Sequence, residues 1–210
     1  QPNISQKEKW RKDLFENHFE NLYNLSFLDK KIDYKTRLII WPETAFVKLY
    51  PKDKGSLEKL SHRVLNKTND FLFTGLINVV KGDYYNSSIL LNINNKKNLI
   101  YNKSILVPFG EYIPFRSMFP FLSSLATDVD FVKGSKNLNF HKENMLNFLP
   151  LICYEIIFEN YIRNNVNSET AFIINITNDA WFGTTIGPHQ HYQFSKIRAV
   201  EFGLPIYRVA

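Results

Sequence analysis

The stretch FLPLICYEIIF, residues 148–158, joins an apolar strand to the start of a helix at Cys153. Residues 148–153 form a continuous apolar run, which is typical of a strand buried on both faces. A helix is predicted to begin just after Cys153 and to run to about Asn164. Cys153 is the only cysteine in the sequence. Taken alone, Cys153 is better interpreted as a small core residue than as a reactive one, because free cysteine is among the most often buried residue types.

Strand patterns and helix patterns alternate on both sides of this stretch. A capping-box pattern, Ser5 to Glu8, precedes apolar residues at helical spacing up to Tyr23. Two further helices are predicted at 56–69 and 188–202. The remaining predicted strands are 37–41, 71–76, 87–93, 98–103, 171–177 and 204–210. This alternation, with hairpins inserted mid-chain, predicts a single α/β domain over 1–210 with a mixed sheet covered by helices.

The composition indicates one globular domain and argues against a nucleic-acid partner. The chain has 210 residues, 44% of them hydrophobic, which is enough to bury a substantial core. Its net charge of +6 comes largely from scattered lysines, without zinc-finger spacing or an RNA-binding signature. A generic lysine-rich surface and attraction to anionic lipid head groups both remain open interpretations.

The ends of the sequence predict a longer parent protein. No window approaches the run of roughly 18 apolar residues that a membrane span requires. The sequence opens without an initiator methionine and stops inside the apolar run LPIYRVA, residues 204–210. We therefore expect an internal piece of a longer protein, truncated at both ends.

Three chemically distinct side chains each follow a predicted strand. Glu43 follows the run RLIIW, Lys103 follows NLIYN, and Cys153 follows FLPLI. Loops just beyond strand ends collect functional groups in α/β proteins. An ammonium group and a helix N-terminus stabilise a thiolate, and a carboxylate can serve as general base. The trio predicts a nucleophilic centre; the alternatives are an exposed turn carboxylate at Glu43 and a surface lysine at Lys103.

Four blocks of the sequence resemble the nitrilase superfamily of carbon–nitrogen hydrolases. The blocks are WPETAF (41–46), YNKSILVPFGEYIPF (101–115), LICYEIIF (151–158) and NITNDAWFGTTIGPHQHYQFSKIRAVEFGLPIYR (175–208). More narrowly, they resemble the extracytoplasmic domain of the bacterial apolipoprotein N-acyltransferase family. The resemblance implies a four-layer α-β-β-α sandwich, here short of its closing strand. It also implies a Glu–Lys–Cys triad formed by Glu43, Lys103 and Cys153.

The resemblance implies supporting residues around that triad. Glu111 matches a second carboxylate, which supports the lysine and the tetrahedral intermediate. Tyr154 and Glu155 match the residues after the nucleophile and are expected to orient that turn. Trp41 and Trp181 are expected to shape the walls of the substrate pocket.

The histidines of the segment GPHQHY are not predicted to bind metal. His189 and His191 lie two positions apart near a helix start and therefore point in different directions. No carboxylate or thiol cluster in the sequence completes a metal site around them. Asn178 and Asp179 remain open between turn formers and site residues. No metal ion or organic cofactor is predicted.

The segment FRSMFPFLSSLA, residues 115–126, is strongly apolar and carries a single charge. It follows Glu111 closely in the sequence. Phe119 and its neighbours are interpreted as a lid that dips into the membrane or holds acyl chains. Packing of these residues into the core of the domain remains the alternative.

The resemblance implies a two-step acyl transfer in lipoprotein maturation. Cys153 attacks an acyl ester of a phospholipid and leaves a thioester on the enzyme. The α-amine of a diacylglyceryl-cysteine in an apolipoprotein then takes the acyl chain. Such an enzyme is expected to be a monomeric transmembrane protein of the bacterial inner membrane, with this domain on the periplasmic side.

Two other functions remain open alternatives. The first is a soluble amidase of the same superfamily, which would use the same triad on a small amide with water as the acceptor. The second is a catalytically silent domain that binds lipid or lipoprotein. The intact set of Glu43, Lys103 and Cys153 argues against a silent domain, since such a domain has no need of all three.

Overall fold

A computed structural model provides the structure of the chain. It describes residue 2 and residues 4–27, 34–93, 98–114, 130–135 and 147–210. The segment 115–126, including Phe119, lies outside the described residues, so the lid hypothesis stays a prediction. Among the described helices, none combines the length and the apolar character needed to cross a membrane.

The first sheet has five strands built around one long central strand, β3 (Asp70–Val80). Two short strands, β1 (Arg37–Ile40) and β2 (Phe46–Tyr50), pair in parallel with successive halves of β3 along the same edge. On its other edge β3 pairs with the antiparallel strand β4 (Asp83–Leu91), which pairs with β5 (Leu99–Asn102). The edge strand is therefore interrupted at residues 41–45, and the interruption places a largely buried loop beside the middle of β3.

The second sheet has three parallel strands in the order β6 (Phe148–Ile152), β7 (Phe172–Ile176) and β8 (Ile206–Val209). All residues of β6 and β7 are buried, as their continuous apolar runs require. Helices connect these strands, as parallel pairing demands. They are α4 (Glu159–Arg163) and α5 (Gly187–Phe202).

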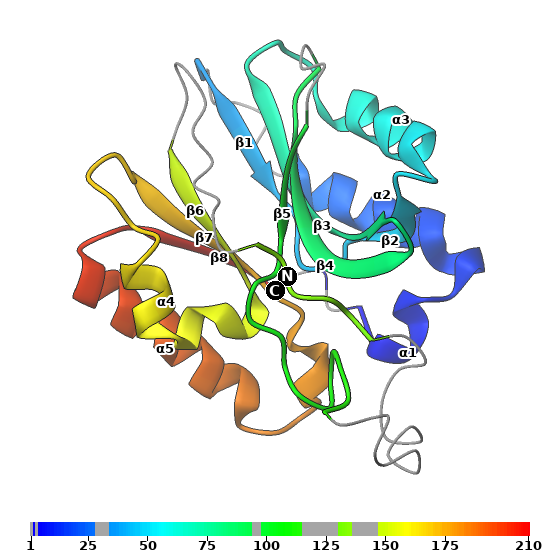
Figure 1. The fold of residues 1–210 in the computed structure, drawn as a ribbon. Coiled ribbons are helices and arrows are strands. Elements are labelled where there is room, and N and C mark those ends of the chain that lie inside the picture. The colour runs from blue at the N-terminus through cyan, green and yellow to red at the C-terminus, as the bar shows by residue number, and fades with distance from the viewer. Residues whose placement is uncertain (1, 3, 28–33, 94–97, 115–129, 136–146) are drawn as a thin grey trace.

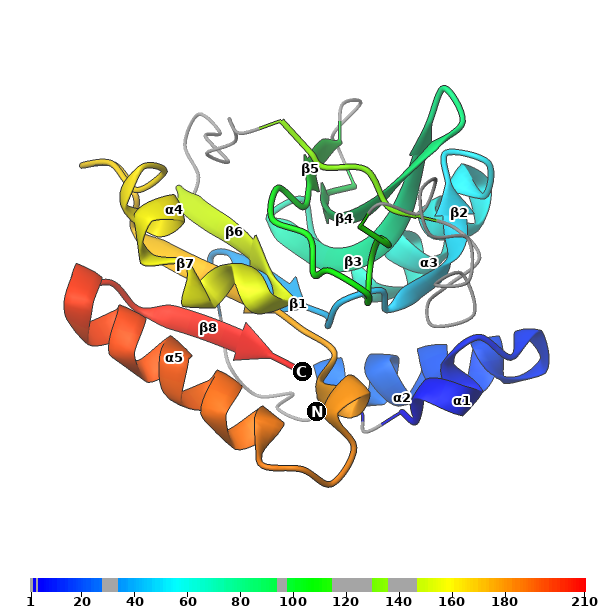
Figure 2. The same ribbon diagram turned by 60° about the horizontal axis from the view of Figure 1, so that its bottom comes forward.

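The two sheets pack face to face, and helices cover both outer faces (Figures 1 and 2). Because side chains alternate along a strand, each apolar strand places side chains on both faces of its sheet, one toward the other sheet and one toward the helices. Phe71, Phe73, Phe148, Phe172 and Ile174 fill the space between the sheets. The outer residues of the first sheet pack on α2 (Phe15–Ser26) and α3 (Lys54–Val64), and those of the second pack around α4 and the end of α5. The predicted four-layer α-β-β-α sandwich is confirmed.

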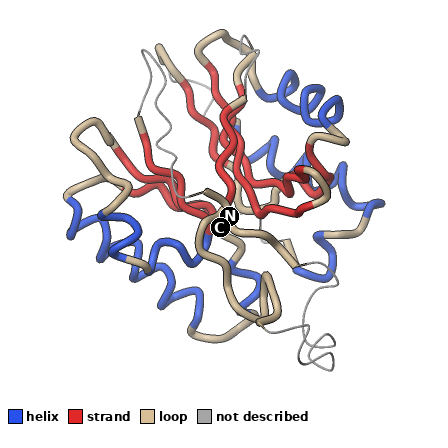
Figure 3. The backbone as a smooth tube through the Cα atoms, viewed as in Figure 1, coloured by secondary structure: helices blue, strands red, loops and turns tan. Residues whose placement is uncertain are grey.

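Several predicted elements have different bounds in the structure (Figure 3). The N-terminal helix is broken into α1 (Gln6–Lys9), a short 3-10 helix (Lys12–Leu14) and α2. Ser5 caps its start, since the Ser5 hydroxyl accepts a hydrogen bond from the Glu8 backbone N–H, and the same hydroxyl donates to the Glu8 carboxylate. Strand β2 was missed, because it is only five residues long and lies between Pro42 and Pro51.

The helix predicted after Cys153 is also interrupted. Residues Cys153–Ile157 form a 3-10 helix, and α4 starts only at Glu159, after an extended Phe158. A tighter turn brings the main chain around sharply at the end of β6. The predicted strand at 71–76 continues to Val80 and turns into β4 through Lys81 and Gly82, both with positive φ.

Candidate active site

Glu43 is positioned by the interruption between β1 and β2. The backbone N–H of Gly75 in β3 donates to the carbonyl of Pro42 at 3.2 Å, and the N–H of Glu43 donates to the carbonyl of Thr177, just beyond β7, at 3.3 Å. A Cβ atom on Gly75 would lie 2.3 Å from the Thr44 nitrogen and 2.7 Å from the Glu43 Cα. Glycine at position 75 therefore lets the Glu43 backbone approach β3 closely and reach the second sheet.

Lys103 is positioned in the same way at the end of β5. Its N–H donates to the carbonyl of Asn86 at 2.8 Å, and its carbonyl accepts from the N–H of Gly134 at 2.8 Å. A Cβ atom on Gly134 would lie only 2.0 Å from the Asn102 carbonyl oxygen. Both charged residues thus depend on a glycine that allows two backbone segments to pack against each other.

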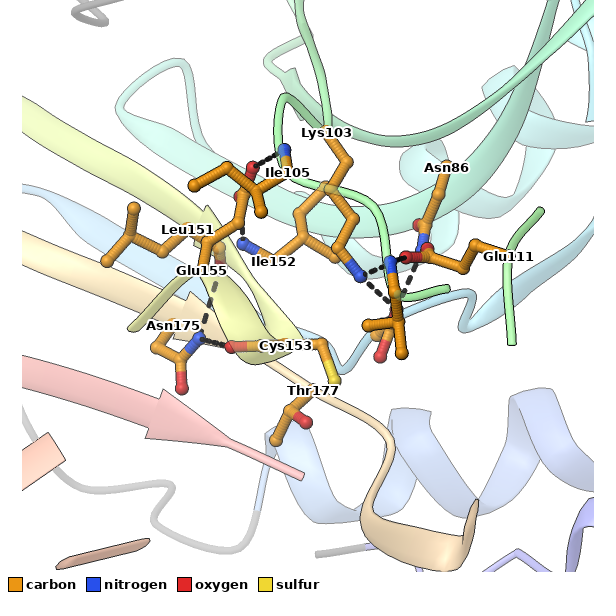
Figure 4. Close-up of polar contacts among 12 residues, drawn as sticks. Asn86, Lys103, Ile105, Glu111, Leu151, Ile152, Cys153, Glu155, Asn175 and Thr177 are labelled. Atoms are coloured by element: carbon orange, nitrogen blue, oxygen red, sulfur yellow. Dashed lines mark hydrogen bonds and ion pairs between the residues drawn. The ribbon is translucent and has the colours of Figure 1, made fainter. Parts of the chain in front are cut away.

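Glu43, Lys103, Glu111 and Asn86 form one buried polar cluster. Figure 4 shows the side chains of Lys103, Glu111 and Asn86 pointing toward one another. The Lys103 Nζ lies 2.8 Å from Oε2 of Glu111 and 4.0 Å from Oε1 of Glu43. The Asn86 side-chain amide donates to Oε1 of both carboxylates, at 2.7 Å each. Burial alone would lower the pKa of Lys103, but the negative charges of Cys153, when ionised, and of Glu43 and Glu111 raise it above its ordinary value. Lys103 therefore remains a cation.

One carboxylate oxygen of this cluster is free to act. Among the described residues, Oε2 of Glu43 is buried and has no hydrogen-bond partner. Its partner oxygen, Oε1, is held by Asn86, so the carboxylate plane is fixed. A buried carboxylate oxygen without a donor is a strong acceptor for a proton.

Cys153 occupies a strained turn at the end of β6. Its φ is 52°, in the left-handed region that residues other than glycine rarely adopt. Two side chains donate to its carbonyl oxygen: the Asn175 amide at 3.2 Å and the His191 Nε2 at 3.1 Å. Since a carbonyl only accepts, Nε2 of His191 carries a hydrogen. These two donors hold the main chain in the conformation that aims the thiol toward the charged cluster (Figure 4).

The thiol of Cys153 is protonated at neutral pH. Burial and the neighbouring Glu43 carboxylate raise its pKa to about 12, while Lys103 and the Thr177 hydroxyl lower it by less. The sequence analysis expects the Lys103 ammonium and a helix N-terminus to stabilise a thiolate. Lys103 does favour the thiolate, but burial and the Glu43 carboxylate outweigh it, and the helix that begins at Cys153 is a 3-10 helix of only five residues. The thiol needs a base at the moment it reacts.

A second set of polar residues supports Cys153 from behind. Asp179 lies 3.3 Å from Nδ1 of His191 and 2.6 Å from Nη2 of Arg208, oxygen to nitrogen in both cases. Burial would raise the pKa of Asp179, but the hydrogen bonds from His191 and Arg208 lower it below its ordinary value. The ring of His191 also stacks on Tyr154, with centroids 5.3 Å apart. Arg208, Asp179 and His191 thus form a chain of contacts that ends on the Cys153 carbonyl.

The sequence analysis missed this chain of contacts. It considered His191 only as a metal ligand and left Asp179 between turn former and site residue. The three residues come from α5, the loop after β7, and β8, so no local spacing connects them. The one available signal was their position within the block that resembles the nitrilase superfamily, residues 175–208.

Glu155 acts on the backbone rather than in the cleft. It is fully buried, and its carboxylate accepts hydrogen bonds from the Tyr101 hydroxyl and from the N–H groups of Ser104, Ile105 and Ile152. Burial raises its pKa against the effect of Lys103 and these donors. Glu155 therefore ties the turn that carries Cys153 to the loop that carries Lys103, and it does not line the pocket.

The two tryptophans expected in the pocket walls have different positions. Trp181 lines the cleft beside Tyr154 and Phe182 and is 56% exposed. Trp41 does not line it. Its ring is buried against Phe19 of α2, and its Nε1 donates to the Ser26 hydroxyl at 2.9 Å. Because side chains alternate along an extended segment, Trp41 points to the outer face of the first sheet, and its expected place in the pocket wall is corrected.

A cleft of about 660 Å³ opens over the reactive groups. Glu43, Lys103, Glu111 and Cys153 lie along it, and most of its other walls are apolar or aromatic. The apolar walls on the side of the first sheet come from Leu49, Ile77, Tyr84 and Phe131. Lys9 and Trp10, from the N-terminal segment, complete the lining on one side. Such a cleft accommodates a ligand with a long apolar part and one polar reacting group.

Comparison with known sequences relates this site to one family. The profile of the carbon–nitrogen hydrolase family matches residues 17–210. An apolipoprotein N-acyltransferase of Rickettsia prowazekii (strain Madrid E) is 42% identical over 215 residues, which cover 100% of this chain and 42% of that protein. The protein of the same name from Haemophilus ducreyi (strain 35000HP / ATCC 700724) is 34% identical, with the same coverage of both chains. The chain therefore spans less than half the length of these relatives.

Comparison with solved structures relates the fold to the same superfamily. Nit3 of Saccharomyces cerevisiae, a member of branch 10 of the nitrilase superfamily, superposes with a TM-score of 0.67. The match covers 92% of this chain and 69% of Nit3, at 17% identity. XC1258 of Xanthomonas campestris, a CN-hydrolase superfamily protein, superposes with a TM-score of 0.61 over 92% of this chain and 69% of its own, at 13% identity. At such low identity these matches speak for the fold alone.

Proposed function

The chain belongs to the carbon–nitrogen hydrolase family, and we propose that it is the catalytic domain of an apolipoprotein N-acyltransferase. One observation carries the proposal: a buried thiol, a buried cation and an unpartnered carboxylate oxygen line the same apolar cleft. Relatives named apolipoprotein N-acyltransferase match the full length of the chain at up to 42% identity, which supports this choice within the family.

In the first half-reaction, Cys153 attacks the ester carbonyl carbon of a phospholipid. Because the thiol is protonated at rest, Glu43 takes its proton through Oε2 as the S–C bond forms. The Lys103 ammonium stabilises the resulting oxyanion, and Glu111 and Asn86 hold Lys103 and Glu43 in place. The ester C–O bond then breaks, Glu43 returns the proton to the departing alcohol, and a lysophospholipid leaves. Cys153 keeps the acyl chain as a thioester.

In the second half-reaction, the neutral α-amine of a diacylglyceryl-cysteine attacks the thioester carbonyl. Glu43 accepts the amine proton, and Lys103 again stabilises the oxyanion. The C–S bond breaks, and Glu43 passes the proton to the sulfur, which restores the thiol. The raised pKa of Cys153 assists this last step, because a buried thiolate beside Glu43 takes up a proton readily. The products are an N-acylated apolipoprotein and the free enzyme, with no cofactor consumed.

The partners and location follow from this reaction. Both substrates carry acyl chains, so we infer that the domain works at a membrane surface, as part of a bacterial inner-membrane protein with this domain on the periplasmic side. We infer that one copy of the chain suffices, since each proposed reacting group comes from the same chain.

Intact mass spectrometry of the full-length protein in detergent tests the proposal. After incubation with phosphatidylethanolamine and no acceptor, we expect a mass increase of one acyl chain that hydroxylamine removes. The Cys153→Ser variant should show no hydroxylamine-sensitive adduct. Absence of any adduct in the wild-type protein, together with release of ammonia from small amides, would assign the amidase function instead. Full acyl transfer by Cys153→Ser would contradict the proposed nucleophile.

A further inference from the structure

Lys9, the last residue of α1, is a second cation in the cleft that the proposed mechanism does not use. Its side chain is buried and lines the cleft together with Glu43 and Cys153. It also lines a smaller adjoining cavity of about 150 Å³, behind Glu43 and Thr44. Lys9 lies before residue 17, where the match to the family profile begins. It is therefore a feature of this chain beyond the part that the family profile covers.

The ammonium group of Lys9 has fewer acceptors among the described residues than it can use. It can donate three hydrogen bonds, and among the described residues it makes one, to the backbone carbonyl of Glu43 at 2.9 Å. The Glu43 carboxylate is directed elsewhere, toward Asn86 and Lys103. Burial lowers the pKa of Lys9 to about 8, although the negative charges of Glu43 and of ionised Cys153 raise it. A buried cation with one neutral acceptor is costly, and an anionic ligand would relieve that cost.

The proposed acyl donor carries an anion close to its reacting bond. In a glycerophospholipid, only the glycerol backbone separates the scissile ester from the phosphodiester. An ester carbonyl placed at the Cys153 sulfur therefore leaves the phosphate a short distance along the same cleft. Lys9 lines the same cleft as Cys153, so its ammonium group faces the space that such a group would occupy. Lysine is a common point-charge ligand for phosphate.

We propose that Lys9 binds the phosphodiester of the acyl donor and so selects phospholipids over uncharged acyl esters. The assignment rests on the proposed function and adds a recognition element to it. In the donor complex, two free N–H groups of Lys9 donate to phosphate oxygens while the third keeps its bond to the Glu43 carbonyl. The phosphate stays bound to Lys9 while the ester reacts at Cys153, and no proton moves through Lys9.

A purely structural role for Lys9 makes a different prediction. If Lys9 only held the Glu43 backbone in place, its loss would slow the reaction of every ester equally. If Lys9 binds phosphate, its loss slows the reaction of phosphate-bearing donors well beyond any slowing that all esters share. The comparison of two donors that differ only in the phosphate head group therefore separates the two roles.

The experiment measures single-turnover thioester formation by intact mass in the full-length protein in detergent. The donors are phosphatidylglycerol and diacylglycerol with the same acyl chains. We expect the wild-type protein to react faster with the phospholipid. Lys9→Met should lose roughly 10- to 100-fold more of the phospholipid rate than of the diacylglycerol rate, a difference typical of one charge-assisted contact. Lys9→Arg, which keeps the charge, should keep most of the preference.

Matched controls make each outcome informative. Lys12→Met changes an exposed lysine three positions away and should leave both rates unchanged. Thioester formation from diacylglycerol by Lys9→Met also shows that the site is folded. Equal slowing of both donors in Lys9→Met, or an unchanged phospholipid rate, would overturn the assignment and leave the proposed function standing. Absence of a thioester with either donor in the wild-type protein would overturn both.

Discussion

The two sheets position their reactive groups by different physical means. At the end of the first sheet, Glu43 and Lys103 are oriented by side-chain contacts: an amide and an ion pair fix the charged atoms themselves. At the end of the second sheet, Cys153 has its main chain held, through two donors on its carbonyl and a left-handed φ of 52°. A charged group can be aimed by neighbours that bond to it, whereas a thiol bonds weakly and must be aimed through its backbone.

The free-energy cost of the site is therefore electrostatic at the first sheet and conformational at the second. The first sheet carries buried charges that are stable only together, and the second carries a strained turn that is stable only when clamped. Loss of one member of the charged cluster should therefore affect folding as strongly as catalysis. Loss of one clamp on Cys153 should affect the reaction more than the fold.

The largest effect is expected for Lys103→Met. It leaves Glu43 and Glu111 buried side by side without their cation, which should lower the free energy of unfolding by roughly 3–5 kcal/mol and abolish thioester formation. Urea denaturation and intact mass measure the two effects. Adding Glu111→Gln removes one of the uncompensated charges and should recover part of the stability without recovering activity. A double variant no more stable than Lys103→Met would show that charge balance is not what Lys103 contributes.

A smaller effect is expected at His191, on the side of the second sheet. His191→Phe keeps an aromatic ring beside Tyr154 and loses the donor to the Cys153 carbonyl. Loss of one such hydrogen bond should slow thioester formation roughly tenfold. His191→Gln places an amide donor near the position of Nε2 and should restore most of the rate. Single-turnover mass spectrometry at saturating and subsaturating donor measures whether the loss lies in the chemical step. Equal losses in the two variants would argue against the carbonyl contact.

The smallest effect concerns the pH at which the Cys153 thiol on the second sheet ionises, because Glu43 on the first sheet influences the pKa of that thiol. Because burial and Glu43 raise the pKa of Cys153 to about 12, the thiol should show no ionisation between pH 7 and 10. Ultraviolet absorbance of the thiolate, as the difference between wild type and Cys153→Ser, measures this titration. Glu43→Gln removes a charge that raises the pKa and should move the titration to lower pH. An ordinary thiol pKa near 8.5 in the wild-type protein would contradict the general-base role of Glu43.

The same raised pKa has a consequence for stability. Below pH 8.5 the thiol is protonated in both the folded and the unfolded chain, so its contribution is constant. Between pH 8.5 and about 12 the unfolded chain releases the proton and the folded chain retains it. The folded state therefore loses stability as pH rises through this window. Cys153→Ser removes this dependence and serves as its control.

Much of the architecture could be predicted from local patterns. Continuous apolar runs mark β6 and β7 as strands covered on both faces, and Gly203 ends α5 with a left-handed φ of 61°. Edge strand β2 and the division of the N-terminal helix were missed, because partly buried edges leave little periodic signal. The short 3-10 helix after Cys153 was predicted as an α-helix, since its composition suits both.

The residues of the candidate site likewise divide into those that the sequence predicts and those that only the structure places. The residue types and their places after strands indicate Glu43, Lys103 and Cys153 from the sequence alone, since strand ends of one layered fold gather at one edge. The positions of Trp41 and Glu155 could not be derived from the sequence in that way. Each lies next to a predicted site residue in the chain, and each is directed away from the cleft by its strand or turn geometry.

The sequence by itself determined the fold class and the chemistry of the reacting groups, because apolar periodicity and residue type are local properties. Only the tertiary structure decided the ionisation of Cys153, the clamp of His191 and the position of Lys9. Those properties depend on burial and on contacts between residues that are far apart in the sequence. His191, for example, lies 12 positions from Asp179 and 38 positions from Cys153. Glu43 belongs to both groups: its carboxylate is encoded locally, and its free oxygen exists only where Gly75, Asn86 and the second sheet meet it.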